Sequence, residues 1–269
     1  RRLNVTIKNF NITNFTFGIY IPQTNNSIIL NNTAYNNTNY GIVLSDSFNN
    51  VIENNSANYN VVHGIFLSDS SNNNVTNNVI RSNLIDGLRL SSSSSFNNLL
   101  SNIIDNNGYG IDLIGNSANN TLSGGMINNS RSDAIYFGTD TIENNIFSNV
   151  SIMNTNNSRY DIYFAASGID GNYFIDMPHI GNYSFTGTGG TVYFKDTKYG
   201  EIRFLQAIND SGTNLSNDVR ILNNSVSVNS SGKPGLNKSA NITLYNIGER
   251  GFVTIAILRD GIKCPAGVC

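Results

Sequence analysis

Charged side chains are scarce in this sequence. Only 13% of the 269 residues are charged, about half the share in ordinary soluble proteins, and the formal net charge is −2. Without a basic surface, binding to nucleic acid or to an anionic membrane is not expected. No apolar run approaches the roughly 20 residues of a transmembrane helix, so we expect no membrane span in this segment. We interpret the chain, which begins at Arg1, as a piece of a longer precursor.

Cysteine and histidine are nearly absent too. The two cysteines, Cys264 and Cys269, cannot complete a structural zinc site with His63 and His179, which lie far away in sequence. We expect a disulfide between the cysteines in an oxidising compartment, with a redox pair as the alternative. Neither a metal ion nor a cofactor is expected.

Asparagine supplies the polarity that charge does not. The chain has 50 asparagines and only 4 prolines. Because asparagine side chains compete for backbone hydrogen bonds, this composition favours turns and disfavours helices. Short apolar clusters recur regularly along the chain, which argues against a disordered linker.

A phrase of glycine, apolar, any residue, apolar recurs with a fixed period. It begins at Gly18, Gly41, Gly64, Gly87 and Gly110, at intervals of 23 residues. The same pattern continues at wider spacing as Ala134-Ile135-Tyr136-Phe137, Asp161-Ile162-Tyr163-Phe164 and Thr191-Val192-Tyr193-Phe194. The insertions therefore fall in turns.

Two further apolar clusters follow each glycine phrase, such as those at Ile52 and at Val79-Ile80. Three short strands in 23 residues are too little chain for a βαβ unit of about 30 residues or a propeller blade of about 40. They fit one turn of a right-handed parallel β-helix, an all-β fold, with a small antiparallel β module after it. We predict the β-helix over residues 1–204 and a β-sandwich-like module over 205–269.

Equivalent residues of successive coils should stack in columns about 4.8 Å apart. The column that begins with Ile19 should point inward and form the core, with Ile42, Ile65, Leu88, Ile111, Ile135, Ile162 and Val192. A buried asparagine ladder, broken at Gly124, should contain Asn9, Asn31, Asn54, Asn77, Asn102 and Asn149. The alternative is that these asparagines are exposed.

These phrases resemble the right-handed parallel β-helix repeat family of NosD-type and pectin-lyase-like proteins. The resemblance covers about residues 1–204 and implies the fold, but not an activity, since the family contains lyases, hydrolases, epimerases and adhesins. Residues 235–243, with Leu258-Arg259-Asp260-Gly261 and the cysteines, look like the β module that follows β-helices in some archaeal surface proteins. Such a module could cap the last coil.

Catalytic groups of the pectin-lyase-like enzymes lie on the outer face of the first strand. The outward column here holds one base, Arg89, and one acid, Asp112, which we expect to form a surface ion pair. His63 occupies the variable position before the repeat glycine and is interpreted as a turn residue. We therefore predict no catalytic residues. Apart from Val43, the other residues of the column are aromatic: Tyr20, Phe66, Tyr136, Tyr163 and Tyr193. Their rings could bind carbohydrate or a partner, or simply pack together.

Glycosylation sequons number 19, about twice the chance expectation. Asn31, Asn54 and Asn149 are excluded as sites because the ladder should bury them. The candidates are Asn36, Asn128, Asn156, Asn182, Asn214, Asn223 and Asn237.

The sequence thus favours a non-catalytic extracellular or cell-surface glycoprotein that acts as a scaffold, adhesin or fibre subunit. Its expected partners are surface glycans or proteins, or further copies that associate end to end or laterally. The alternative is a β-helix protein that binds or cleaves polysaccharide. A metal-delivery role like that of NosD is disfavoured, because clusters of Met, Cys and His are missing.

Overall fold

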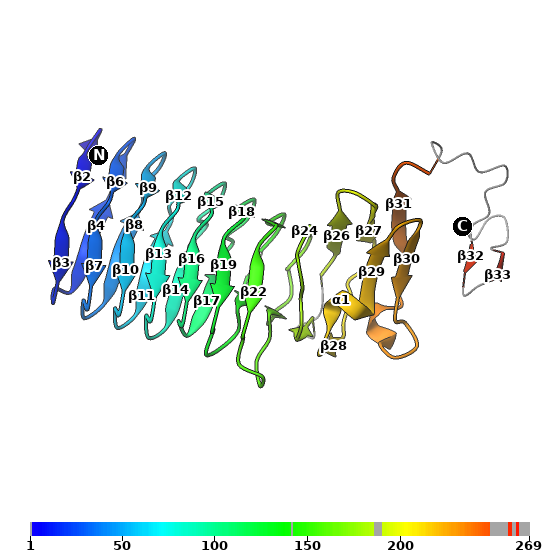
Figure 1. The fold of residues 1–269 in the computed structure, drawn as a ribbon. Helices are drawn as coiled ribbons and strands as arrows, with labels where there is room; N and C mark the ends of the chain where they lie inside the picture. The colour runs from blue at the N-terminus through cyan, green and yellow to red at the C-terminus, as the bar shows by residue number, and fades with distance from the viewer. Residues whose placement is uncertain (1, 141, 186–189, 248–257, 260–261, 264–269) are drawn as a thin grey trace.

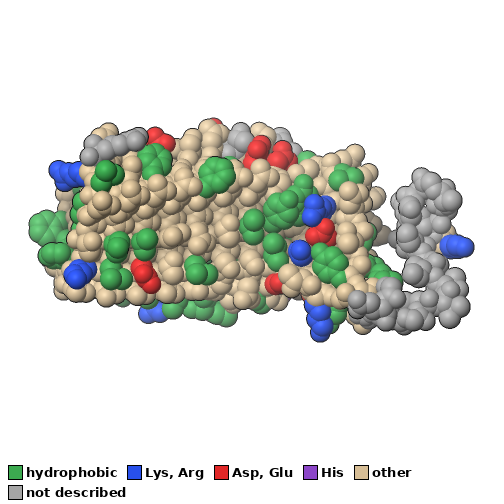
Figure 2. All heavy atoms as spheres, turned by 90° about the horizontal axis from the view of Figure 1, so that it is seen from above, with side chains coloured by type: hydrophobic (Ala, Val, Ile, Leu, Met, Phe, Trp, Pro, Cys, Tyr) green, Lys and Arg blue, Asp and Glu red, His purple; other side chains and the backbone are tan. Residues whose placement is uncertain are grey.

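The computed structural model describes residues 2–140, 142–185, 190–247, 258–259 and 262–263. These residues form an all-β solenoid of stacked coils that runs from the N-terminus through β24, followed by further strands and a short helix (Figure 1). The predicted fold class is confirmed. Figure 2 shows one side of the solenoid, where backbone and uncharged side chains cover most of the surface and charged side chains stand apart.

Three long sheets run along the solenoid, one for each strand of a coil. The first sheet contains the glycine phrases: β4 (Phe17–Pro22), β8 (Tyr40–Ser45), β11 (His63–Ser68), β14 (Asp86–Ser91), β17 (Tyr109–Leu113), β20 (Ile135–Phe137), β23 (Ile162–Phe164), β25 (Tyr183–Ser184) and β28 (Ser211–Gly212). The second contains β2 (Thr6–Lys8), β6 (Ile28–Leu30), β9 (Val51–Glu53), β12 (Asn74–Thr76), β15 (Asn98–Leu100), β18 (Thr121–Ser123), β21 (Ile146–Ser148), β24 (Asn172–Ile175), β26 (Val192–Asp196), β27 (Gly200–Phe204) and β31 (Ala240–Leu244). The third contains β3 (Asn11–Thr13), β7 (Thr33–Tyr35), β10 (Ser56–Asn58), β13 (Val79–Arg81), β16 (Ile103–Asp105), β19 (Met126–Asn128) and β22 (Ser151–Met153).

The predicted core columns are present. Ile42, Ile65 and Leu88 pair directly across β8, β11 and β14, and all three are fully buried. Because alternate residues of a strand face opposite sides, the residues two positions later also point inward and complete the core. The buried column in the later coils becomes aromatic, with Phe137 and Phe164 at ring contact.

The asparagine ladder exists, but most of the predicted residues were wrong by one position. Asn31, Asn54 and Asn77 are exposed and adopt positive φ angles, a conformation that asparagine tolerates better than most residues, and Asn149 does the same. The next residue of the chain is the one that turns inward. Only Asn102 was assigned correctly, because the expected phrase at Leu100 was itself displaced by one residue from the buried Leu99.

Three buried ladders run along the corners of the solenoid. Each asparagine that has a successor donates its backbone N–H and its Nδ2 to Oδ1 of that next asparagine. Nδ2 also donates to a backbone carbonyl of the preceding coil, as Asn55 does with Asn78 and Ile29. The ladders satisfy corner backbone groups that water cannot reach. Their members are Asn32, Asn55, Asn78 and Asn102; Asn37, Asn60, Asn83 and Asn107; and Asn50, Asn73, Asn97, Asn120, Asn145 and Asn172.

The expected assignment of Val192 and Tyr193 to the first sheet was wrong. Residue 192 pairs with Asn172, so this phrase belongs to the second sheet, and Tyr183 in β25 takes the place beside Ile162. The error arose because strands of both sheets share the apolar, any residue, apolar pattern. A shortened coil before residue 190 had hidden β25.

Antiparallel pairing replaces parallel pairing at the C-terminal end. β27 pairs with β26, β31 pairs with β27, and β28 pairs with β25, so the last parallel strands of the first two sheets receive partners. A short helix α1 (Leu215–Asp218) leads into the hairpin of β29 (Val219–Leu222) and β30 (Ser225–Val228). The second sheet therefore continues past residue 204, and a separate module over 205–269 stays a prediction.

Candidate binding face on the first sheet

The outer face of the first sheet brings together four of the five predicted aromatic residues. Tyr20, Phe66, Tyr136 and Tyr163 all lie in its outward column, and the rings of Tyr136 and Tyr163 are 5.6 Å apart. Tyr193 is not part of this face. Its ring packs on Tyr173 in the second sheet, 4.4 Å between centroids.

A second column, not anticipated as functional, supplies more rings. It is the position immediately before the repeat glycine or its equivalent. Its ring-bearing members are Phe17, Tyr40, His63, Tyr109 and Tyr160, and the other two coils have Asp86 and Asp133 there. These side chains contact the outward column, because the Tyr109 ring lies 4.9 Å from Tyr136 and Tyr40 lies 5.3 Å from Phe66. The repeated aromatic residue before glycine could have revealed this column from the sequence.

The rings form two clusters on the face. We call the N-terminal one, which contains Phe17, Tyr20, Tyr40, His63 and Phe66, the first ring cluster. The second ring cluster contains Tyr109, Tyr136, Tyr160 and Tyr163.

A charged centre lies between the two ring clusters and consists of Asp86, Arg89 and Asp112. Arg89 Nη1 is 3.2 Å from Asp86 Oδ2 and 3.1 Å from Asp112 Oδ2, so one guanidinium bridges two carboxyl groups. The predicted Arg89–Asp112 pair is present, but it is not a surface pair, because Asp86 is fully buried and Asp112 is 4% exposed.

His63 is not a turn residue, so that interpretation was wrong. It lies inside β11, is 4% exposed, and stacks on the Tyr40 ring at 5.1 Å with an interplanar angle of 4°. Its Nδ1 atom is 2.9 Å from Asp86 Oδ2. The histidine thus links the first ring cluster to the charged centre.

The neighbouring aspartate and the buried position both disfavour ionisation of Asp112. Burial, and then the negative charge of Asp86, raise the pKa of Asp112 from 3.8 to about 7, against the opposing effect of Arg89, and Asp112 also hydrogen-bonds to Asp86. Within the described residues, Oδ1 of each aspartate is buried and has no other hydrogen-bond partner. Two ionised carboxylates in this position would repel each other.

This raised pKa should make the fold less stable as pH rises from about 4 to 7. Over that interval the folded chain keeps the Asp112 proton while the unfolded chain releases it, which costs about 1.4 kcal/mol for each pH unit. Asp112→Asn, which cannot ionise, should flatten this part of the profile. Urea denaturation at several pH values measures both slopes, and equal slopes in the two proteins would contradict the raised pKa of Asp112.

The predicted glycosylation sites differ in the exposure and hydrogen bonding of their side-chain amides. Asn36, Asn156, Asn223 and Asn237 are exposed, whereas Asn128, Asn182 and Asn214 are partly buried. The amide of Asn214 caps α1, and Asn128 donates to Asp105. Within the described part of the chain, Asn223 and Asn237 are the candidates whose side chains make no hydrogen bond. The exclusion of Asn31, Asn54 and Asn149 as buried was wrong, since all three are exposed.

The predicted disulfide lies outside the described residues, because Cys264 and Cys269 are not among them. In the parts that are described, no three His, Cys, Asp or Glu side chains form a group that could hold a metal ion. No helix of the described segments is long and apolar enough to cross a membrane.

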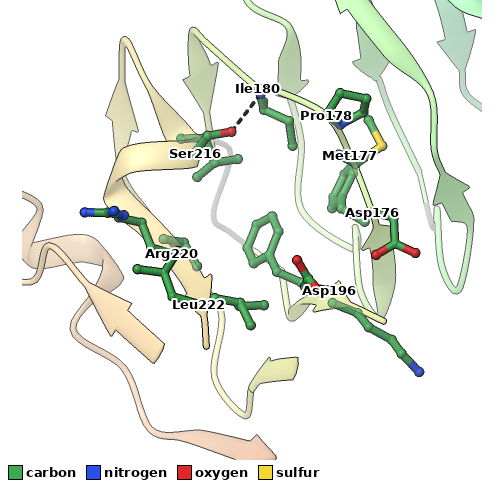
Figure 3. A pocket seen from close by; sticks show the side chains of 14 residues that line it. Asp176, Met177, Pro178, Ile180, Asp196, Ser216, Arg220 and Leu222 are labelled. Carbon is green, nitrogen blue, oxygen red and sulfur yellow. Dashed lines mark hydrogen bonds between the residues drawn. The ribbon is translucent and has the colours of Figure 1, made fainter. Parts of the chain in front are cut away.

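A separate hollow of about 210 Å³ lies between the last coils and the C-terminal elements (Figure 3). Apolar side chains from β24, β26, α1 and β29 line it, with Asp176, Asp196 and Arg220 also in its wall. Both aspartates already accept hydrogen bonds from turn backbone, Asp176 from Thr197 and Asp196 from Lys198. The acids therefore serve the turns, and the hollow offers no comparable set of convergent polar groups.

Comparisons with known proteins agree with the architecture. The stacked parallel coils make the chain a right-handed parallel β-helix, and a family described as "Right handed beta helix region" matches residues 2–127. No curated protein matches the sequence.

Two solved structures have the same fold. The A-module of the mannuronan C-5 epimerase AlgE4 from Azotobacter vinelandii is 20% identical with a TM-score of 0.59, over 66% of this chain and 54% of that one. PfbA, a surface adhesin of Streptococcus pneumoniae, is 12% identical with a TM-score of 0.53, over 84% and 68%. The chain thus spans about half the length of the epimerase module, and likeness at these identities shows the fold alone.

Proposed function

We propose that this chain is an extracellular or cell-surface protein that binds glycan chains along the outer face of the first sheet. The observation that carries the proposal is the row of two ring clusters on one rigid face, with hydrogen-bonding groups between them. Aromatic rings present flat apolar surfaces to the C–H faces of sugars, and tyrosine hydroxyls add donors and acceptors. The surface adhesin among the structures of the same fold is consistent with this role.

The geometry of the face suits an extended ligand. Equivalent residues recur at the separation of neighbouring strands, about 4.8 Å, and the sheet fixes their orientation. A polymer that lies along the solenoid could contact both ring clusters at once. Weak contacts to single sugars would then add up along the chain.

Replacing Tyr136 and Tyr163 together by alanine should weaken glycan binding at least tenfold, since truncating an aromatic anchor commonly costs more than about 1.4 kcal/mol. Affinity electrophoresis in gels that contain soluble polysaccharides measures the change. Tyr35→Ala/Tyr59→Ala is a matched control, because these exposed rings also touch across adjacent coils, 5.2 Å apart, but lie away from the first sheet. If both double variants lost the same glycan affinity, the outer face of the first sheet would not be the binding site.

A second candidate function is polysaccharide cleavage, and the charged centre favours it. A carboxylic acid that holds its proton near neutral pH beside a second carboxyl group is suited to general acid–base chemistry. Incubation with uronate and neutral polysaccharides would reveal this activity as new reducing ends or unsaturated products. The cleavage should disappear in Asp112→Asn.

The surface location rests on fewer observations. Intact-mass measurement with and without deglycosylation and reduction tests the glycans and the Cys264–Cys269 disulfide together. End-to-end or lateral association into fibres, and the resemblance of the C-terminal segment to archaeal surface modules, remain predictions. Electron microscopy that shows only single particles would count against the fibre.

A further inference from the structure

Resting on the proposed glycan binding, we infer that the glycan is uncharged and that the face rejects polyuronates. The inference names the ligand class of the site, and it follows from how the charges on the face are already paired. On this inference the chain would not bind mannuronan, the polyuronate named for the epimerase of the same fold.

The strands that form the face offer no unpaired cation. On the first-sheet strands β4, β8, β11, β14, β17, β20 and β23, the basic side chains are His63 and Arg89, and the acidic ones are Asp86 and Asp112. Arg89 contacts both aspartates, and His63 faces Asp86. Every basic group on these strands therefore already has an acidic partner.

The charge of the centre cannot attract a third carboxylate at slightly alkaline pH. Arg89 is the one guanidinium between the two carboxyl groups, so a single ionised aspartate already balances its charge, and ionisation of both leaves these three side chains with a net charge of −1. Asp133, buried at the edge of the second ring cluster, adds a further acid, although Arg159 lies close enough to interact with it. A uronate brought to this centre would meet carboxyl groups held in a poorly solvated site, where like charges repel strongly.

Recognition of a carboxylate ordinarily uses an arginine whose two parallel N–H groups are free. Nη1 of Arg89 is bound to two aspartates, and its side chain is only 26% exposed. A sugar hydroxyl does not need a free pair of parallel N–H groups. It can accept a hydrogen bond from a remaining guanidinium N–H, or exchange hydrogen bonds with the tyrosine hydroxyls, and it carries no charge. Neutral glycans thus gain the ring contacts without the electrostatic cost.

The binding experiment compares a soluble β-glucan, a mannan and a galactan with polymannuronate and polygalacturonate at pH 7.5 and low salt. We expect binding to at least one neutral polymer, with at least tenfold weaker binding to both polyuronates. Tighter binding to a polyuronate that Tyr136→Ala/Tyr163→Ala abolishes would overturn the inference and leave the proposed function standing. No binding to any of the five polymers would overturn both.

A gain of binding tests the electrostatic cause directly. Asp86→Asn/Asp112→Asn keeps the side-chain shapes but frees the charge of Arg89, so affinity for polygalacturonate should rise at least tenfold. Glu53→Gln/Asp105→Asn makes the same change of net charge on the second and third sheets and should leave that affinity unchanged. Circular dichroism tests whether each variant is folded. If the double variant unfolds, the single variant Asp112→Asn replaces it and should show a smaller gain of affinity for polygalacturonate. An unchanged affinity in the folded variants would overturn the inference.

Discussion

Replacing Asn55 by alanine should destabilise the folded chain by roughly 4 kcal/mol. Oδ1 of Asn55 accepts from the backbone N–H of Asn32, and its Nδ2 donates to the carbonyl of Ile29, at 2.9 and 2.8 Å. Alanine would leave both backbone groups buried without these partners, and each such loss costs about 1–3 kcal/mol. Urea denaturation followed by circular dichroism measures the difference.

The neighbouring asparagine provides the control. Asn54 is exposed, and its φ of 54° is one that glycine adopts without strain. Asn54→Gly should therefore change the free energy of unfolding by less than about 1 kcal/mol. If Asn54→Gly and Asn55→Ala had the same effect, the ladder would not be the source of the stability.

Gly64→Ala should destabilise the fold by about 3 kcal/mol or more, the upper range for overpacking a well-packed interior. An added Cβ would stand 2.3 Å from Cγ2 of Ile80, 2.6 Å from Nδ2 of Asn83 and 2.8 Å from the carbonyl oxygen of Gly87. The first contact lies in the core, the second in a ladder and the third in the next coil. None can move without disturbing its neighbours, so the loss should appear in thermal and urea denaturation alike.

The same column contains its own control at Ala134. This coil and the next have Ser130 and Thr155 where earlier coils have ladder asparagines, and a methyl group is accommodated there. Ala134 lies just before β20, and Ala134→Gly should cost only about 0.5–1 kcal/mol, the usual penalty of glycine relative to alanine in ordered backbone. A mild effect of Gly64→Ala would mean that the repeat glycines are not required by packing.

The period of the sequence predicted most of the fold. Equal spacing of Gly18, Gly41 and Gly64 implied stacked coils, and inward alternation then placed the core correctly. The position of each corner was harder to predict, because two adjacent asparagines at a turn have the same composition whichever one points inward. Only the positive φ of Asn54 and the hydrogen bonds of Asn55 separate them.

The candidate site was predicted only in part. The outward column could be derived from strand alternation, which gave Tyr136, Tyr163 and the Arg89–Asp112 pair. Asp86 was missed and His63 was wrongly interpreted as a turn residue, because both precede the glycine, where alternation no longer applies. Their convergence on Arg89 depends on the path of the backbone at that corner, which the spacing of the residues does not specify.

Some of the glycosylation sequons have a structural origin. A corner favours asparagine at positive φ, then a ladder asparagine, then a residue that begins a strand, for which Ser and Thr are suitable. Asn31-Asn32-Thr33 and Asn54-Asn55-Ser56 both arise in this way. The sequons at these corners therefore meet the needs of the fold whether or not they carry glycans, and their abundance is not independent support for a surface location.

Two of the three ladders end at the same level of the solenoid. Asn102 is followed in its column by Gly125, and Asn107 by Ser130, whose buried Oγ has no hydrogen-bond partner among the described residues. Only the ladder through Asn120 and Asn145 crosses this level. Each coil is bound mainly to its neighbours. A pulling force along the long axis of the solenoid should therefore separate neighbouring coils first at this level, and the coils on either side should stay folded for longer.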